Sequence, residues 1–186
     1  MLIFFFFSFE PAENAITVNG EGVSNVGLIN VEMYGNVRDL SIYQTDIFFF
    51  EVYIHDSNFN GDASIYLTDS NLTIQSSNFS EISGRRVLQT VDSNVMINNS
   101  RFENCNAGVY YGSALYASGD KPTEIYIEDS TFSNSFLPLD LSGNHTIGIN
   151  NCDFIGNYGP SEGGAIYLSM KKDVLIIDSR FTENSA

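Results

Sequence analysis

Acid–base chemistry on a polysaccharide would need carboxylates set beside a histidine or a cationic residue, and this sequence of 186 residues offers few such arrangements. A hydrolase of the polygalacturonase type would carry paired aspartates with Gly-His-Gly and Arg-x-Lys, and neither string occurs. A lyase would need an arginine or lysine base beside calcium-binding carboxylates. The basic residues occur singly or as Arg85-Arg86 and Lys171-Lys172, which we interpret as solvated turns. We assign no catalytic residue, no metal ligand and no cofactor.

Tyrosines could bind a ligand instead, because the ring packs on a sugar or a partner and the hydroxyl forms hydrogen bonds. Three lie beside glycine-containing segments and three lie in the long segments 103–111 and 155–162: Tyr66, Tyr116 and Tyr167, and Tyr110, Tyr111 and Tyr158. We predict that these six bind the ligand, since variable insertions on a rigid scaffold often collect on a binding face. Two alternatives stay open: the first three pack on one another across repeats, or the long segments reflect drift in loop length alone.

The chain is strongly acidic, with a formal charge of −15 and eight basic residues. This charge opposes binding to nucleic acid or anionic lipid. We interpret the acidity as a solubilising surface rather than as a cation site. Cys105 and Cys152 lack C-x-x-C spacing and are predicted to be free thiols. Both histidines are predicted to lie at the surface, His55 at an outward position and His145 in a turn.

A hexapeptide that recurs six times indicates which elements hold these side chains. Its pattern is Ile-x-[Asp/Asn/Ser]-[Ser/Cys]-x-Phe. The copies begin at Ile54, Ile74, Ile97, Ile127, Ile149 and Ile176. A fixed pattern of this kind is the signature of a repeat architecture.

A second element consists of a glycine followed by a small residue and an apolar pair. It occurs at Gly61, Gly112 and Gly163, with a weaker copy at Gly84. From this glycine to the Phe of the following hexapeptide the distance is 18 residues in three copies and 20 in the fourth. From the Phe to the next glycine it varies from 2 to 10 residues. One arc of each repeat is therefore nearly constant, and one turn takes up the variation in length.

This repeat predicts an all-β fold, a right-handed parallel β-helix in which each turn of the chain, or rung, lies about 4.8 Å above the last. About eight rungs would start near residue 15, and helices should be nearly absent. The Ile, the Ser/Cys and the Phe of the hexapeptide would point inward, and its third position would take residues that tolerate a tight turn. The alternative is an antiparallel sandwich, which has no need for the same residue at the same place in successive repeats.

Two short motifs in the C-terminal half resemble a known repeat family. Phe154-Ile155-Gly156-Asn157 precedes Gly163-Gly164-Ala165-Ile166, and Phe181-Thr182-Glu183-Asn184 repeats the first of them. These strings resemble the FxxN and GGA[ILV] motifs of the polymorphic outer-membrane protein repeats. Residues 102–105 and 112–115 are degenerate copies, and the match is poor before about residue 50. The resemblance implies a pectin-lyase-like right-handed β-helix displayed on a cell surface, often as an adhesin.

The two ends of the chain carry separate expectations. Residues 1–14 include an apolar run too short to span a bilayer, which we expect to be a degenerate secretion signal. A first strand or cap, or an artefact of a gene fragment, are the alternatives. Residues 15–186 are predicted to form one β-helix domain. Because the last repeat is incomplete and lacks a polar cap, we expect a longer parent chain or self-association through open solenoid ends.

These observations predict a non-enzymatic module, extracellular or on the cell surface, for adhesion or structural display. Its expected partner is a glycan or a cell-surface protein. A polysaccharide lyase or glycoside hydrolase on the same fold is the alternative. A pocket with three or more carboxylates beside an Arg or Lys would favour the enzyme, whereas a flat face lined by tyrosines would favour binding.

Overall fold

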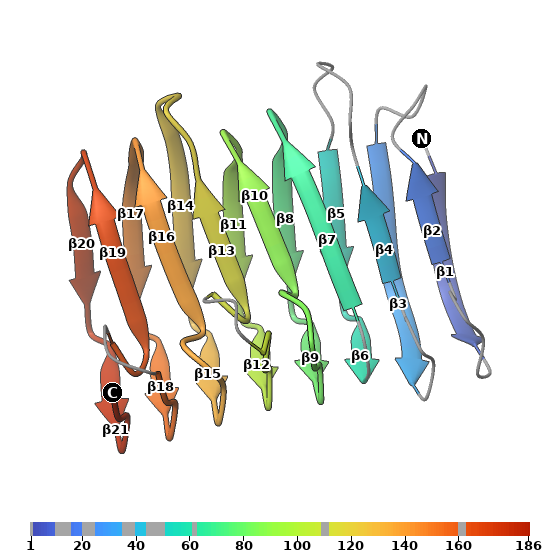
Figure 1. Ribbon diagram of the computed structural model, residues 1–186. Helices are drawn as coiled ribbons and strands as arrows, with labels where there is room; N and C mark the ends of the chain where they lie inside the picture. The colour runs from blue at the N-terminus through green and yellow to red at the C-terminus, as the bar shows by residue number, and fades with distance from the viewer. Residues whose placement is uncertain are drawn as a thin grey trace.

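In this computed structural model, the protein consists of parallel strands that stack in register (Figure 1). The structure describes residues 2–9, 16–19, 25–34, 40–43, 51–60, 63–108, 112–159 and 163–186. Successive turns of the chain pair with one another, so the fold is an all-β parallel solenoid, as the repeat predicts. No helix occurs among the described residues. The right-handed coil and the count of eight rungs stay predictions.

The strands lie on three faces, which we number in the order in which the chain visits them after residue 50 (Figure 1). Face 1 consists of β5 (Glu51–His55), β8 (Asn71–Gln75), β11 (Asn94–Asn98), β14 (Thr123–Glu128), β17 (His145–Asn150) and β20 (Val174–Ile177). Face 2 consists of the short strands β6 (Asn58–Asn60), β9 (Asn78–Ser80), β12 (Arg101–Glu103), β15 (Thr131–Ser133), β18 (Asp153–Ile155) and β21 (Arg180–Thr182). Face 3 is a separate seven-stranded sheet of β2 (Ile16–Asn19), β4 (Leu40–Tyr43), β7 (Ala63–Thr68), β10 (Leu88–Val91), β13 (Leu115–Ser118), β16 (Leu139–Gly143) and β19 (Ile166–Met170).

Two longer strands precede these elements. β3 (Asn25–Tyr34) pairs with both β5 and β6, which joins faces 1 and 2 into one sheet. β1 (Leu2–Phe9) pairs in parallel with β3 over Leu2 to Phe9. This pairing fits the alternative of a first strand, while cleavage of a signal stays a prediction.

The predicted inward columns are confirmed. The Phe residues of successive hexapeptides are Cα partners, and their rings stack with centroids 4.8–5.1 Å apart and interplanar angles of 4–16°. The Ile residues of the pattern pair in the same way, and the first five are completely buried. Complete burial of an Ile or Phe side chain contributes about 1.5–3 kcal/mol, so these two columns form much of the core. The last copy is less covered, since Ile176 is 37% and Phe181 is 49% exposed.

The small inward column holds neighbouring rungs together with hydrogen bonds. Each Ser hydroxyl donates to the backbone carbonyl two residues earlier, and those from Ser77 onward also accept the backbone N–H of the equivalent residue one rung before. Ser77 Oγ, for example, donates to Gln75 O over 2.8 Å and accepts from Ser57 N over 3.2 Å. The column contains Ser57, Ser77, Ser100, Ser130, Cys152 and Ser179. Its five members up to Cys152 are buried. The hydrogen bonds satisfy polar atoms that would otherwise be costly to enclose.

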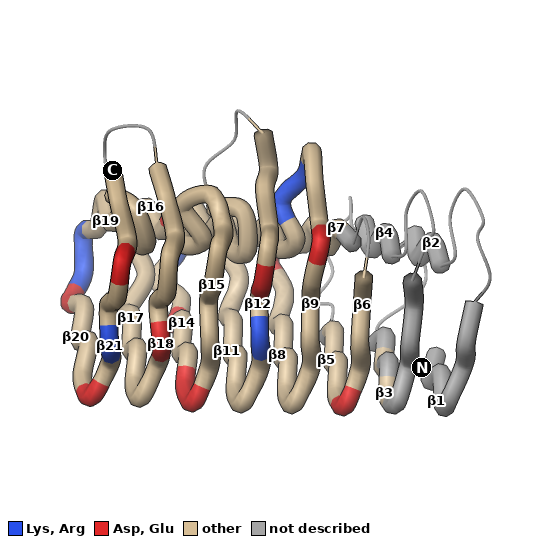
Figure 2. Tube along the Cα trace, turned by 90° about the horizontal axis from the view of Figure 1, so that it is seen from below, with Lys and Arg blue, Asp and Glu red and all other residues tan. Residues whose placement is uncertain are grey.

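The third hexapeptide position makes the turn between faces 1 and 2, and all six residues there have a positive φ: Asp56 (49°), Ser76 (50°), Asn99 (47°), Asp129 (49°), Asn151 (49°) and Asp178 (48°). Asp and Asn tolerate this left-handed conformation better than other residues with a side chain. They also bond along the stack, as Asn151 Nδ2 donates to Asp129 Oδ1 over 2.7 Å. Figure 2 shows that uncharged turns separate the acidic ones, as predicted from stacking.

The FxxN motif places its Asn inside the corner that follows face 2. Asn157 is fully buried, and its Nδ2 donates to Phe132 O over 2.9 Å, while its Oδ1 accepts from Ser135 N over 3.0 Å. Asn184 repeats the arrangement one rung further on, donating to Phe154 O over 2.8 Å. Each amide thus bonds the backbone of the preceding rung at two points, through its N–H and through its oxygen, which is why this position suits Asn.

The GGA motif is a point of close approach between rungs. A Cβ on Gly164 would lie 2.4 Å from the carbonyl oxygen of Ser185, and Gly163 has a φ of +149°. The glycine elements are not all equivalent, however. Gly84 precedes the paired residue Leu88 by four positions, whereas Gly112 precedes Leu115 by three. The rung that contains β16 has no such glycine, although its hexapeptide, which begins at Ile149, is one of the six copies.

Candidate functional site

Three of the predicted tyrosines share one column on the outer side of face 3, but they are not neighbours. The paired residues run Tyr66, Gln89, Tyr116, Asp140 and Tyr167 along the stack. One rung separates each tyrosine from the next, a spacing of roughly 9.6 Å between alternate rungs. The alternative that these rings pack on one another is therefore wrong, and the stripe is interrupted by an amide and an acid. Tyr66, Tyr116 and Tyr167 are all half-buried.

The ring of Tyr116 already has a partner. The Arg86 guanidinium carbon lies 3.8 Å from its centroid, a cation–π contact. Arg86 Nη1 also donates to Gln89 Oε1 over 3.4 Å. One face of the Tyr116 ring is therefore covered by Arg86, which leaves it less suited to stacking on a ligand.

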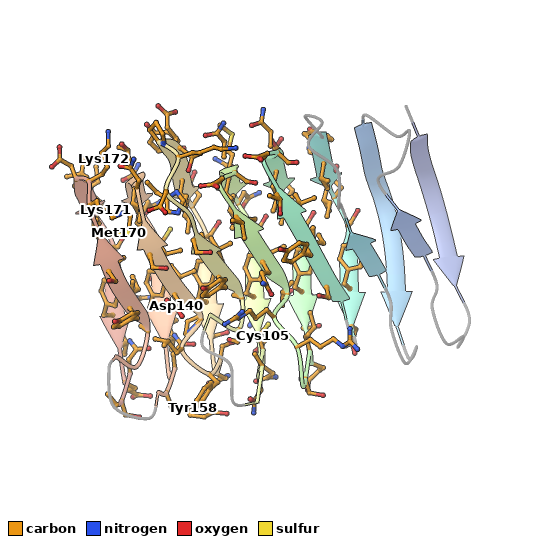
Figure 3. All side chains as sticks on the ribbon, turned by 45° about the horizontal axis from the view of Figure 1, so that its top comes forward. Cys105, Asp140, Tyr158, Met170, Lys171 and Lys172 are labelled. Carbon is orange, nitrogen blue, oxygen red and sulfur yellow. The ribbon has the colours of Figure 1, made fainter. Side chains whose placement is uncertain are left out.

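Tyr158 lies at the corner between faces 2 and 3 and is 42% exposed. Its ring meets Phe136 edge-on at 5.4 Å, and its hydroxyl accepts from Asn106 Nδ2 over 3.3 Å. Figure 3 shows Tyr158 at the opposite end of the strands from Lys171 and Lys172. Tyr110 and Tyr111, together with residues 160–162 of the second long segment, lie outside the described residues.

Face 1 carries a second outward column that the sequence reasoning missed. It runs Tyr53, Thr73, Met96, Tyr126, Gly148 and Leu175. Four of these are large and exposed: Tyr53 (38%), Met96 (50%), Tyr126 (38%) and Leu175 (60%). The signal was present, because each residue comes directly before the Ile of a hexapeptide and alternation puts it on the outer side of the strand.

Polar side chains lie beside this column. Asn94 Nδ2 donates to Asn71 Oδ1 over 2.9 Å, and the backbone N–H of Glu124 donates to Asn94 Oδ1 over 2.9 Å. On the other side, Tyr53 Oη donates to Gln75 Oε1 over 3.4 Å. Asn71 and Asn94 border a shallow hollow, which we call the face 1 site. It is lined by Asn71, Leu72, Thr73, Asn94, Val95, Met96, Glu124 and Tyr126.

Gly148 shapes one edge of this site. A Cβ at Gly148 would lie 2.8 Å from Cδ1 of Tyr126, so the tyrosine ring rests against the glycine of the next rung. The ring therefore has a defined position over the sheet while its outer part stays exposed to solvent.

The prediction that His145 lies at the surface in a turn is wrong. His145 begins strand β17 and is 1% exposed. Its Nδ1 bonds the hydroxyl of Thr123, its partner one rung earlier. Burial lowers the pKa of His145, so the neutral imidazole is favoured.

Both cysteines are free thiols, as predicted, and both are buried. Burial raises the pKa of Cys105 to about 12 and also raises the pKa of Cys152. A thiol that stays protonated at neutral pH is a poor nucleophile. In the described part of the chain, no three His, Cys, Asp or Glu residues are grouped to hold a metal ion.

Charged residues at the corner between faces 3 and 1 bond along the solenoid axis. Lys121 Nζ pairs with Asp69, and the backbone N–H of Lys121 donates to Asp92 Oδ1 over 2.8 Å. Lys171 Nζ pairs with Asp120 over 2.7 Å. These bonds raise the pKa of Lys121 and lower that of Asp120. Two acidic side chains at this corner, Asp69 and Asp120, thus pair with lysines.

No family model matches this chain, and neither a curated protein nor a solved structure does. The described residues also include no helix of the length and apolar character needed to cross a membrane.

Proposed function

We propose that this protein is a non-enzymatic module for adhesion or display at the cell surface or outside the cell, and that it binds neutral glycans through the face 1 site. The observation that carries the proposal is the row of exposed Tyr53, Met96 and Tyr126 beside amide side chains on one face. Sugar rings have apolar faces that pack on aromatic rings and hydroxyls that bond to amides.

Charge favours a neutral ligand. The six face 1 strands contain no Lys or Arg, and Glu124 lies in the site. A uronate polymer would be repelled by this carboxylate and by the net charge of −15. A ligand rich in hydroxyls meets no such repulsion.

The side chains of face 1 are suited to binding a sugar rather than to cleaving it. Tyr126 and Met96 offer contact area, and Asn71 and Asn94 offer donors and acceptors. Cleavage of a glycosidic bond would instead need two carboxylates about 5–10 Å apart on either side of the bond. The resemblance to polymorphic outer-membrane protein repeats supports a surface location and an adhesive role.

A glycan array that includes neutral and uronate-containing glycans tests this proposal. We expect wild-type protein to bind neutral glycans and Tyr126→Ala to bind them roughly 2- to 10-fold more weakly, from the 0.5–1.5 kcal/mol of an aromatic contact. Tyr116→Ala is the matched control, because its ring lies on face 3 under Arg86. Equal losses in the two variants, or binding to uronates alone, would contradict the proposal.

An assay for released oligosaccharides separates binding from cleavage. Wild-type protein incubated with each bound glycan should leave its size distribution unchanged. Appearance of unsaturated or shortened products would refute the non-enzymatic part of the proposal and favour a lyase or hydrolase.

A further inference from the structure

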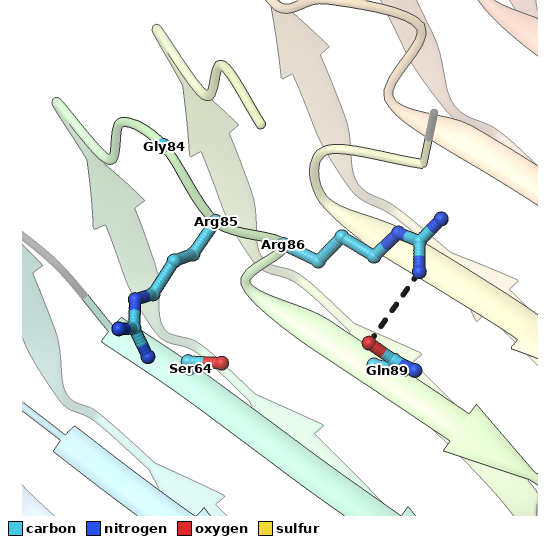
Figure 4. A pocket seen from close by; sticks show the side chains of 5 residues that line it. All are labelled: Ser64, Gly84, Arg85, Arg86 and Gln89. Atoms are coloured by element: carbon cyan, nitrogen blue, oxygen red, sulfur yellow. Dashed lines mark hydrogen bonds between the residues drawn. The ribbon is translucent and has the colours of Figure 1, made fainter. Parts of the chain in front are cut away.

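A second depression lies at the corner where the chain passes from face 2 to face 3, and its chemistry differs from that of the face 1 site. It is lined by Ser64, Gly84, Arg85, Arg86 and Gln89 (Figure 4). None of these residues is acidic, and two of the eight basic residues of the chain lie here. The depression is therefore locally positive on a protein of charge −15.

The two arginines have different surroundings. Arg86 is held by the Tyr116 ring and by Gln89. Arg85 is exposed, and Figure 4 shows its side chain extending away from Arg86 toward Ser64. Within the described part of the chain, no hydrogen bond or ion pair engages the Arg85 guanidinium.

Four other cations of this protein have acidic partners. Arg101, Lys121, Lys171 and Arg180 each pair with a carboxylate, namely Glu103, Asp69, Asp120 and Asp153. In an acidic protein, an arginine that lacks such a pair keeps its N–H donors available. The planar guanidinium matches the two oxygens of a carboxylate or a sulfate.

We propose that Arg85, with the Ser64 hydroxyl and the Gln89 amide, binds one oxyanion group, a carboxylate or a sulfate, on an otherwise uncharged ligand. Arg86, fixed over Tyr116, adds positive potential beside the site. The net charge of the protein repels a polyanion, so the ligand carries an isolated acidic group. Tyr66 is the next outward residue after Ser64 on β7 and pairs with Gln89, which places an aromatic side chain beside the anion for the uncharged part of the ligand.

Binding of small glycosides measured by NMR titration at low salt tests this site without reference to face 1. The probes are methyl glucuronide, glucose 6-sulfate, methyl glucoside and heparin. We expect the wild type to bind one or both of the singly charged sugars and to bind the neutral glucoside and heparin more weakly. The preferred probe identifies whether carboxylate or sulfate is the better ligand.

Variants of single residues locate the binding. Arg85→Gln should weaken binding by about 10- to 100-fold, the effect of a charge-assisted hydrogen bond, while Arg85→Lys should retain part of it. Lys172→Gln is the matched control, since it removes the same charge at the opposite corner. Asp62, two residues before Ser64, lies outside the described residues, and Asp62→Asn should leave binding equal or stronger.

Binding at this depression is read from the NMR signals of Ser64, Arg85 and Gln89, which lie away from the face 1 site. Three results would overturn the proposal: equal shifts of these signals by the neutral glucoside, tighter binding of heparin than of the singly charged sugars, or the same loss in Lys172→Gln as in Arg85→Gln. Thermal unfolding of each variant shows whether it is folded. Because the face 1 proposal is tested with Tyr126→Ala and neutral glycans, either proposal can fail while the other stands.

Discussion

Single residues at the turn between faces 1 and 2 determine where each rung bends. A residue with a side chain at a φ near +50° has a strained backbone, and Asn or Asp bears this at the lowest cost. Ser76 is the one residue of another type in the column, and it accepts a hydrogen bond from Asn99 Nδ2 over 3.2 Å. The positive φ and the hydrogen bonds along the stack therefore both favour a short polar residue such as Asn or Asp at this position.

His145 links the stability of the protein to pH. Burial lowers its pKa in the folded state, so the unfolded chain takes up the proton first as the pH falls. We expect the free energy of unfolding to decrease as the pH drops below about 6.5, the unperturbed value for histidine. The contribution of His145 to the free energy of unfolding is complete above that pH. It is lost progressively as the pH falls from about 6.5 to the lowered pKa of the folded state.

Urea unfolding at pH 7.5 and pH 5.5 measures this effect. His145→Gln should lose less stability between the two pH values than the wild type. His55→Gln is the control, because His55 is the only other histidine and is partly exposed beside Asp56. A loss in His145→Gln as large as in the wild type would show that other groups dominate.

The sequence predicted the inward residues well and the outward ones poorly. Ile, Ser and Phe recur because the rung above and the rung below impose the same environment on each, so their positions can be read from the repeat. The outward column of face 1 mixes Tyr, Thr, Met, Gly and Leu, since solvent imposes no such restriction. His145 was misplaced because Asn144-His145-Thr146 has the composition of a turn, although the strand begins at the histidine.

At the scale of elements, the phenylalanine column depends on stacking across strands. Each inner ring contacts two others at about 5 Å, from the rung before and the rung after. Six strands of face 2 are only three residues long, and their central residue is this Phe. The stacked rings thus add to the backbone pairing that holds these short strands in register.

Truncation of one ring measures this contribution. Phe102→Ala should lower the free energy of unfolding by about 3–5 kcal/mol, the usual cost of a Phe-to-Ala change in a packed core. Phe181→Ala should cost clearly less, because Phe181 stacks on one ring only among the described residues and is 49% exposed. Urea midpoints for both variants provide the comparison, and equal costs would argue against a continuous column.

The whole molecule is built from interchangeable rungs, so one rung should be removable. Deletion of residues 79–101 joins Asn78 to Phe102, and Phe79 and Phe102 are Cα partners on adjacent rungs. Every inward column then continues without a break. We expect a folded protein that is shorter by about 4.8 Å along its axis, measurable by small-angle X-ray scattering together with circular dichroism.

An out-of-phase deletion is the control. Deletion of residues 79–95 joins Asn78 to Met96 and puts outward residues into inward columns. This variant should fail to fold. If both deletions fold equally well, register between rungs is not what specifies the solenoid.

The repeat of stacked strands has a consequence for diagnosing aggregation. One molecule contains parallel strands in register and rings spaced 4.8–5.1 Å along a common axis, the same periodicity that cross-β fibrils produce. Aligned native protein should therefore diffract near 4.8 Å without any amyloid being present. For this protein, such a reflection is a property of the native fold, and fibril formation has to be established from particle length.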